Sequence, residues 1–240
     1  MRIRSLVGLA LLAFLILLAM LVLTLPANVV IGAFDGSDRL TRAEGNIWSG
    51  QARWLQPGHP PLLIEWRWQG GRVWHWQATD AQTELEGLWR PGATMTLPEL
   101  NGRLSVERVD LAQWLRVSRP TGFLELALVD VELVSDAAPR AQGEVLWRDA
   151  GLAGAIQESL GLIRLQLEGA DEALRVAVES LEPASVMVRG RIEVDAESYE
   201  LDLWLRADRG RPELQRALID LGERQPDGQV RLQLRGASGF

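Results

Sequence analysis

The side chains that could do chemistry in this sequence are two histidines and many carboxylates. His59 lies in a proline-rich run over residues 57–61 that is typical of a loop, whereas His75 stands between two tryptophans. The two histidines are 16 residues apart, and neither has a carboxylate beside it at ligand spacing. The sequence therefore does not indicate a metal site.

Carboxylates recur at every second position in two places. Asp130 and Glu132 form one such pair, and Asp195 and Glu197 form the other. Side chains two residues apart share one face of a strand, and charged side chains in that pattern usually form its solvated face. We interpret both pairs as surface groups and not as an acid–base pair.

Cysteine and lysine are both absent. Without cysteine there is no thiol catalysis, thiolate metal site or redox motif, and without lysine there is no phosphate-binding Gly-x-x-x-x-Gly-Lys loop. The Gly-x-Ser-x-Gly elbow of serine hydrolases does not occur either. We therefore predict a protein with no catalytic, cofactor-binding or metal-binding residues, which is not an enzyme.

The charge balance argues against nucleic acid as a partner. All 25 basic residues are arginine, the acidic residues number 32, and the net charge is −7. Arg2 and Arg4 precede an uncharged stretch, so the remainder of the chain is more negative still. A negative domain repels the phosphate backbone, which excludes the electrostatic attraction that drives most nucleic-acid binding.

The N-terminal segment has the features of a membrane anchor. Residues 5–25 carry no charge, and a helix of that length spans about 30 Å, the thickness of the hydrocarbon core. Arg2 and Arg4 place the N-terminus in the cytoplasm by the positive-inside rule. A cleaved signal peptide is the alternative, but the sequence around Pro26 makes a poor cleavage site.

We therefore predict a cytoplasmic tip and transmembrane signal-anchor over residues 1–25. Residues 26–240 are expected to form a periplasmic β-rich domain. The protein would then be a single-pass protein of the inner membrane of a Gram-negative bacterium.

Beyond residue 26 the apolar residues alternate with polar ones, which is the pattern of a strand with one buried face. The clearest segments are residues 163–168, 201–205, 230–235 and 64–68. We predict a mainly β fold in which a large curved antiparallel sheet forms a groove or half-barrel. Five glycines are expected to begin strands or to let them bend: Gly102, Gly122, Gly143, Gly190 and Gly228. Short helices are expected over 109–117, over 152–160, and from Pro212 to a stop at Gly222.

Tryptophan is unusually frequent, with ten residues in the chain. Trp66 and Trp68 precede a Gly70-Gly71 turn, and Trp74 and Trp76 follow it. A two-residue hairpin loop would put the two pairs on opposite faces, whereas a bulged three-residue loop would put them on one face. Two interpretations remain open, namely a tryptophan-filled core and an aromatic surface for lipid or a partner.

A short motif follows the anchor and carries a family resemblance. It is the run from residue 43 to 52, and its distinctive positions are Gly45, Ile47, Trp48, Ser49 and Gly50. The run resembles the N protein of the type II secretion system, in which a leucine-rich anchor is followed by Leu-Pro and then Gly-x-apolar-Trp-Ser/Asn-Gly. Residues 143–147, 160–165 and 221–230 are also similar to that family, so the resemblance covers the chain in length and order.

The resemblance implies a non-enzymatic accessory component of the inner membrane, without a cofactor. Such a component supports export of folded proteins from the periplasm across the outer membrane. Its partners would be other secretion components, in the inner-membrane platform or the outer-membrane secretin, and its motif residues would be structural. The family in turn resembles AsmA-like proteins, whose sheets form apolar grooves that carry lipid. That relation implies the alternative function of lipid transport or envelope maintenance.

Overall fold

The computed structural model describes residues 24–27, 39–92, 94–109, 118–133, 137–154, 158–169, 172–208 and 210–237. The expected membrane span and the expected helix over 109–117 lie almost entirely outside these residues. Among the helices that are described, none has the length and apolar character needed to cross a membrane. The chain divides into two compact units, Met1–Asp80 and Ala81–Phe240, while the boundary predicted at residue 25 stays a prediction.

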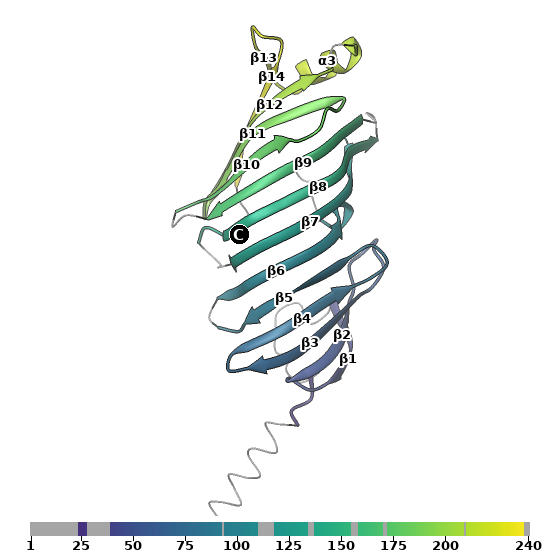
Figure 1. Cartoon of the computed structure of the whole chain (residues 1–240), viewed down its shortest axis with the longest axis vertical. Helices are drawn as coiled ribbons and strands as arrows, with labels where there is room; N and C mark the ends of the chain where they lie inside the picture. The colour runs from purple at the N-terminus through teal and green to yellow at the C-terminus, as the bar shows by residue number, and fades with distance from the viewer. Residues whose placement is uncertain are drawn as a thin grey trace, which may run out of the picture. The chain divides into compact units, whose positions relative to one another are not determined.

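The first unit contains four antiparallel strands, which neighbour one another in chain order (Figure 1). Its strands are β1 (Leu40–Gly45), β2 (Ser49–Trp54), β3 (Leu62–Gly70) and β4 (Val73–Thr79). Cross-strand pairing puts small and aromatic residues on one face and polar residues on the other. The alternation along residues 64–68 therefore reflects a sheet with two unlike faces, as expected.

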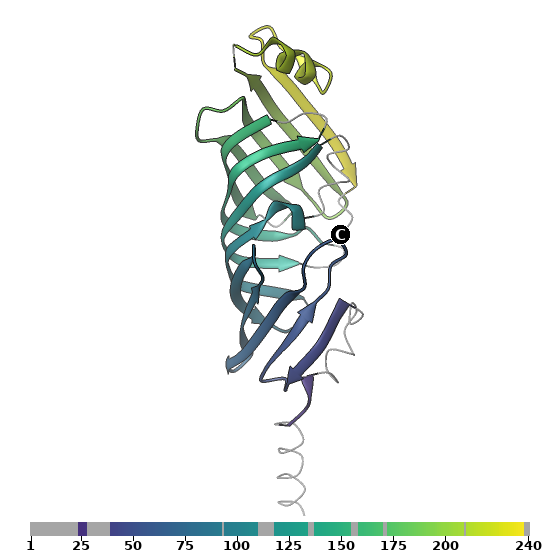
Figure 2. The same cartoon turned by 90° about the vertical axis from the view of Figure 1, so that its right-hand side faces the viewer.

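The second unit contains the other ten strands of the described residues, which are antiparallel and curve as they follow one another (Figure 2). The first five strands are β5 (Glu84–Arg90), β6 (Met95–Ser105), β7 (Ser118–Leu133), β8 (Arg140–Gly154) and β9 (Glu158–Gly169). The others are β10 (Leu174–Ser180), β11 (Val186–Val194), β12 (Ser198–Ala207), β13 (Glu223–Arg224) and β14 (Val230–Ala237). The order is sequential to β12 and then runs β12-β14-β13, so these strands form an open sheet. A mainly β fold with few helices is confirmed.

One helix prediction is wrong. Residues 152–154 and 158–160 are not helical, because β8 continues to Gly154 and β9 begins at Glu158. Leu152 pairs with Glu158, so these residues belong to two paired antiparallel strands. The pairing of the long strands β8 and β9 overrides the weak helical preference of a leucine- and alanine-rich stretch.

The glycines do not begin strands in four of the five cases. Only Gly228 precedes its strand, and the others lie inside β6, β7, β8 and β11. Gly102 and Gly143 have φ angles of +127° and +128°, and a Cβ on either would collide with a carbonyl oxygen of the neighbouring strand. These glycines therefore allow close approach and bending within the sheet, which was the second of the expected roles.

The core of the second unit is aliphatic. One cluster of buried residues comes from β8 to β12, β14 and the helix α3 (Pro212–Ile219), and further buried residues lie on β6 and β7. Leu214 and Leu218 of α3 pack into this cluster, while Pro212 occupies the start of the helix as predicted. Arg211 holds the beginning of α3 to the sheet, since Nη2 donates to Glu158 Oε1 at 2.7 Å and Nη1 donates to Ser185 Oγ at 2.9 Å.

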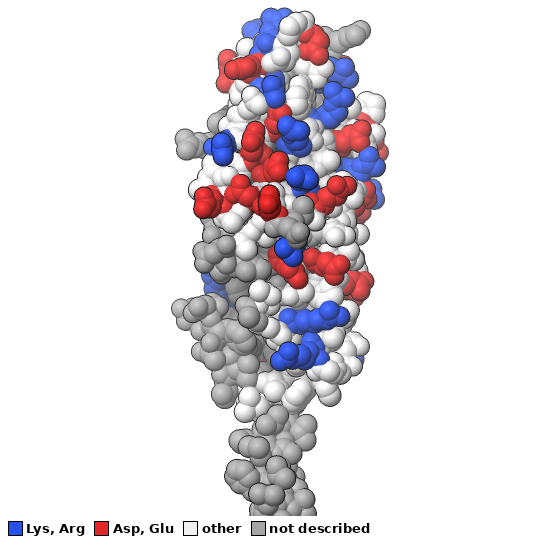
Figure 3. All heavy atoms as spheres, turned by 90° about the vertical axis from the view of Figure 1, so that its left-hand side faces the viewer, with Lys and Arg blue, Asp and Glu red and all other residues white. Residues whose placement is uncertain are grey.

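The opposite face of this sheet carries acidic and basic side chains that are interspersed (Figure 3). This face includes an ion pair between Asp202 and Arg231, in which the aspartate is buried and the arginine is partly exposed. Asp202 is 3% exposed, and its two carboxylate oxygens accept from Arg231 Nε and Nη2 at 2.7 and 2.8 Å. The hydrogen bond from Arg231 lowers the pKa of Asp202, and the guanidinium also lies 5.0 Å from the Trp204 ring.

Candidate functional site

The motif forms a tight turn between β1 and β2. Gly45 has a φ of +89°, a conformation that favours glycine. The Asn46 side chain organises the turn, because Oδ1 accepts from the backbone N–H groups of Trp48 and Ser49 at 2.9 Å each. The Asn46 N–H in turn donates to the Ser49 carbonyl at 3.0 Å. Local chemistry thus closes the turn, as asparagine does in an Asx-turn.

Two tryptophans from other strands hold the backbone of this turn. Trp66 on β3 donates its indole N–H to the Asn46 carbonyl at 3.0 Å, and Trp74 on β4 donates to the Ile47 carbonyl at 3.0 Å. Backbone carbonyls that are partly removed from water need a partner, and here the indole donors supply it. The turn is therefore fixed to the sheet by contacts distant in sequence.

The Trp48 ring packs among further tryptophans. Its centroid lies 5.0 Å from that of Trp68 in an edge-on arrangement, and 6.2 Å from that of Trp74 at an interplanar angle of 15°. The backbone N–H of Trp68 also donates to the backbone carbonyl of Trp48 at 2.6 Å. We call Trp48, Trp66, Trp68 and Trp74 the tryptophan clamp.

The hairpin register explains how the clamp assembles. Trp66 pairs with Trp76 and Trp68 with Trp74, with an irregularity between Trp68 and Gly70. The bulged loop is therefore the correct alternative, and all four tryptophans of the hairpin share one face. Trp68 remains 43% exposed. Trp76 Nε1 is buried without a hydrogen-bond acceptor among the described residues. Whether this face serves as an aromatic surface for lipid or a partner stays a prediction.

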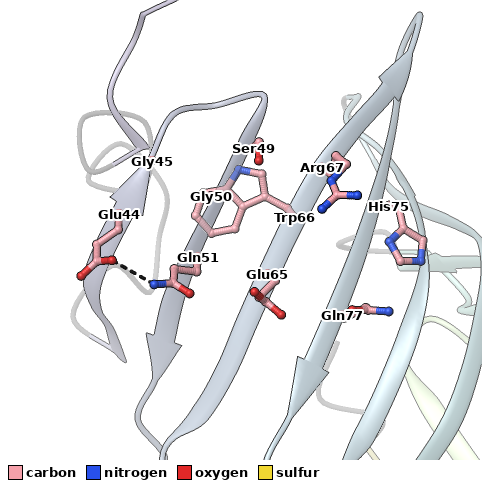
Figure 4. Close-up of a pocket in the computed structure, with 10 residues that line it drawn as sticks. All are labelled: Glu44, Gly45, Ser49, Gly50, Gln51, Glu65, Trp66, Arg67, His75 and Gln77. Carbon is pink, nitrogen blue, oxygen red and sulfur yellow. Dashed lines mark hydrogen bonds between the residues drawn. The ribbon is translucent and has the colours of Figure 1, made fainter.

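The other face of the first unit is polar. Ser49, Arg67 and His75 form one cross-strand row, and Gln51, Glu65 and Gln77 form the next. These residues line a depression of about 440 Å³ beside the motif turn (Figure 4). Gln51 Nε2 donates to Glu44 Oε2 at 2.9 Å at its rim.

Gly50 lines the depression and also contacts the Trp66 ring of the tryptophan clamp. Figure 4 shows the Trp66 indole lying across β2 at this glycine. A Cβ on Gly50 would stand 2.5 Å from the Trp66 ring, so any larger residue would displace the indole. The glycine therefore makes room for a ring that holds the turn.

The depression brings together few of the residues that the sequence marked for chemistry. His75 lines the depression. His59 lies in the β2–β3 loop, where its backbone N–H donates to the Gln56 carbonyl. Within the described ranges, no group of three or more histidines and carboxylates is placed to hold a metal ion. Asp195 closes the β11–β12 turn instead, since its carboxylate accepts from the Glu197 and Ser198 N–H groups, and those bonds lower its pKa.

The family model for type II secretion system (T2SS), protein N matches residues 39–233, which is most of the chain. The chain belongs to the type II secretion protein N family. No curated protein and no solved structure matches it. The relation to AsmA-like proteins finds no support in these comparisons.

The type II secretion protein N match begins at β1 and ends within β14, so it includes the motif turn and strands of both units. Sequence reasoning did not single out Asn46, although an asparagine just after a glycine is a hairpin-turn signal. It also missed Gln51, Glu65, Arg67 and Gln77, whose alternation looks like any solvated strand face. Only the register of three strands places these side chains around one depression.

Proposed function

We propose that this protein is a non-enzymatic accessory component of the type II secretion machinery. It supports the export of folded proteins from the periplasm across the outer membrane. The observation that carries the proposal is the family match, which runs through both units and not through the motif alone. Lipid transport is not favoured, because it rested on the relation to AsmA-like proteins.

The contacts of the motif residues support a non-enzymatic role. The polar groups of the motif are hydrogen-bonded within the turn or to the tryptophan clamp. Asn46 closes the turn, and the Trp66 and Trp74 indoles donate to its carbonyls. In the depression, His75 and Glu65 stand in different cross-strand rows on adjacent strands. We infer that the site presents a shape to a partner and does not transform a substrate.

Location follows from the N-terminal sequence. The uncharged run over residues 5–25 with Arg2 and Arg4 before it supports an inner-membrane anchor. Both units would then stand in the periplasm, where components of the inner-membrane platform or the secretin are within reach. An alkaline phosphatase fusion to residue 240 should be active, and a mature protein beginning at Asn28 would contradict the anchor.

The function is tested by deleting the gene and restoring it on a plasmid. Two quantities are measured in each strain, the export of a folded secreted enzyme and the permeability of the outer membrane to detergent. We expect export to fail while the barrier stays intact, with recovery on complementation. Intact export with a leaky barrier would contradict the secretion role and favour envelope maintenance.

The partner is sought with a single cysteine, because the chain has none of its own. Ser49 is exposed at the edge of the depression, so Ser49→Cys can carry a crosslinker into that surface. Asp227→Cys, in the exposed turn before β14, is the matched control. We expect a crosslink from position 49 to a platform component or the secretin in cells, and none from position 227.

A further inference from the structure

The outer edge of β14 is only partly paired. On its inner side β14 pairs with β12 along eight positions, from Val230 to Ala237. On its outer side the described residues supply only the two-residue strand β13, which pairs with Val230 and Arg231. The remainder of the strand, residues 232–237, therefore has a free edge among the described strands. Free strand edges are templates for pairing with another chain.

The backbone groups that face this free edge can be assigned. The carbonyl of Arg231 points to the outer side, because a Cβ on Gly222, which precedes β13, would collide with it. Backbone groups alternate in direction along an antiparallel strand. The N–H and C=O groups of Gln233, Arg235 and Ala237 therefore also face outward.

The side chains of β14 define what could pair there. Leu232 and Leu234 lie on the apolar face, and Leu234 is 41% exposed. Gln233 and Arg235 lie on the charged face and are exposed. An added strand would therefore place apolar residues beside the leucines and polar residues beside Gln233 and Arg235.

The sign of the charge is indicated by the strands already in place. On the inner side, Asp202 binds Arg231 and Glu200 stands opposite Arg235. On the outer side, β13 puts Glu223 opposite Arg231. Acidic residues thus face the arginines of β14 wherever a strand is present, and an added strand continues this pattern with an acid opposite Arg235.

We propose that the outer edge of β14 binds an extended segment of another polypeptide, with alternating apolar and acidic residues, as an added antiparallel strand that continues the ladder begun by β13. A second copy of the same edge is a poor occupant, because it would bring Arg231 and Arg235 against the same arginines. The proposal concerns this edge and does not depend on the secretion role.

The first test is amide hydrogen exchange on the full-length protein in detergent micelles. The amides of Gln233 and Arg235 should exchange rapidly, whereas those of Leu232 and Leu234, which face β12, should be protected. Protection of Gln233 and Arg235 in the protein alone, at low and high concentration, would overturn the proposal, since the edge would already be covered.

The second test adds a synthetic peptide of about seven residues, the length of a short strand, that alternates valine and glutamate. Exchange at Gln233 and Arg235 should slow as the peptide is titrated. A peptide with arginine in place of glutamate should bind with about two- to five-fold lower affinity, so more of it should be needed to protect these amides. Equal or better binding of the arginine peptide would overturn the predicted chemistry of the partner.

Two variants keep this test specific. Gln233→Pro removes an outward N–H while leaving the bonds to β12, so it should abolish peptide protection without loss of the sheet. Arg235→Glu should reverse the preference between the two peptides. Circular dichroism melting shows that each variant is folded, and binding that survives Gln233→Pro in a folded protein would overturn strand addition.

Discussion

The two units of this protein are stabilised by different kinds of contact. The second unit has a cluster of buried aliphatic residues from six strands, and α3 packs into it. Among the described residues of the first unit, the buried apolar ones are the alanines Ala27, Ala52 and Ala78, and larger apolar contacts come from half-buried tryptophans. Those tryptophans also donate hydrogen bonds to the motif turn.

The difference shows what each sheet depends on. An aliphatic core is stabilised by non-directional burial, so its members can be exchanged for others of similar volume at modest cost. The tryptophan clamp combines burial with directed hydrogen bonds and ring contacts, so its geometry is more demanding. We therefore expect the first unit to respond sharply to small changes around the turn, and the second to respond mainly to lost volume.

The largest effect is expected from Trp48→Ala. It removes both ring contacts of Trp48 and should destabilise the first unit by about 3 kcal/mol. Hydrogen exchange should accelerate in β2–β4 and not in β9–β12, and cellular abundance should fall. Leu218→Ala is the matched change in the second unit, and it should accelerate hydrogen exchange in β9–β12 and not in β2–β4. Equal acceleration of both sheets by either variant would refute the distinction between the units.

Next comes Gly45→Ala, tested against Gly58→Ala. Both glycines have positive φ, +89° and +81°, but a Cβ on Gly45 would lie 2.7 Å from the Gly50 Cα, whereas Gly58 has open space around it. Backbone strain alone costs about 1 kcal/mol, and the collision adds to it, for about 2–3 kcal/mol at Gly45. Thermal melting of the two variants measures the difference, and equal losses would show that the turn is not tightly packed.

A smaller effect with a pH signature is expected from Asp202→Asn in the second unit. The variant should melt roughly 5 °C lower at neutral pH, because it loses a charge-assisted bond to Arg231. The folded pKa of Asp202 is depressed. The stabilisation is therefore present above the unfolded pKa of about 4 and is lost as the pH falls through the lower folded value. The melting temperatures of the two proteins should converge below about pH 4, and a constant gap would contradict the ion pair.

The smallest effect is expected from Trp76→Phe, compared with Trp74→Phe. Trp74 loses a hydrogen bond to the motif turn, which should cost about 1–2 kcal/mol. The change at Trp76 removes a buried donor that has no acceptor among the described residues. Removing the desolvation cost of that donor offsets the stability lost with the smaller ring. Urea unfolding should place Trp76→Phe closer to the wild type. The reverse order would show that the indole of Trp76 has a partner.

Local sequence patterns predicted the parts of this fold that depend on neighbours in the chain. The alternation in residues 163–168 and 230–235 predicted β9 and β14, and Pro212 with Gly222 predicted α3. The tryptophan spacing left two hairpin registers open, because a bulge shifts every side chain to the other face. The structure decides between them through the Trp66–Trp76 pair.

The candidate site was less predictable, since its contacts join distant positions. The bond from the Trp74 indole to Ile47 spans 27 residues, and the pair of Asp202 with Arg231 spans 29. No periodicity carries such information. The polar depression likewise depends on the register of β2, β3 and β4, and the glycines inside β6 and β8 depend on the neighbouring strand.

The central claim is that this protein serves secretion by presenting a folded surface and not by chemistry. The most direct measurement is the export rate of a folded enzyme, per molecule of protein, from cells whose only copy carries Glu65→Gln and His75→Gln. These changes remove the Glu65 carboxylate and the imidazole of the depression and keep polar side chains in their place, while the other carboxylate, Glu44, already accepts a hydrogen bond from Gln51. We predict an export rate equal to that of the wild type. A fall of about 100-fold at normal abundance and melting temperature, the loss expected when a general acid or base is removed, would contradict the claim.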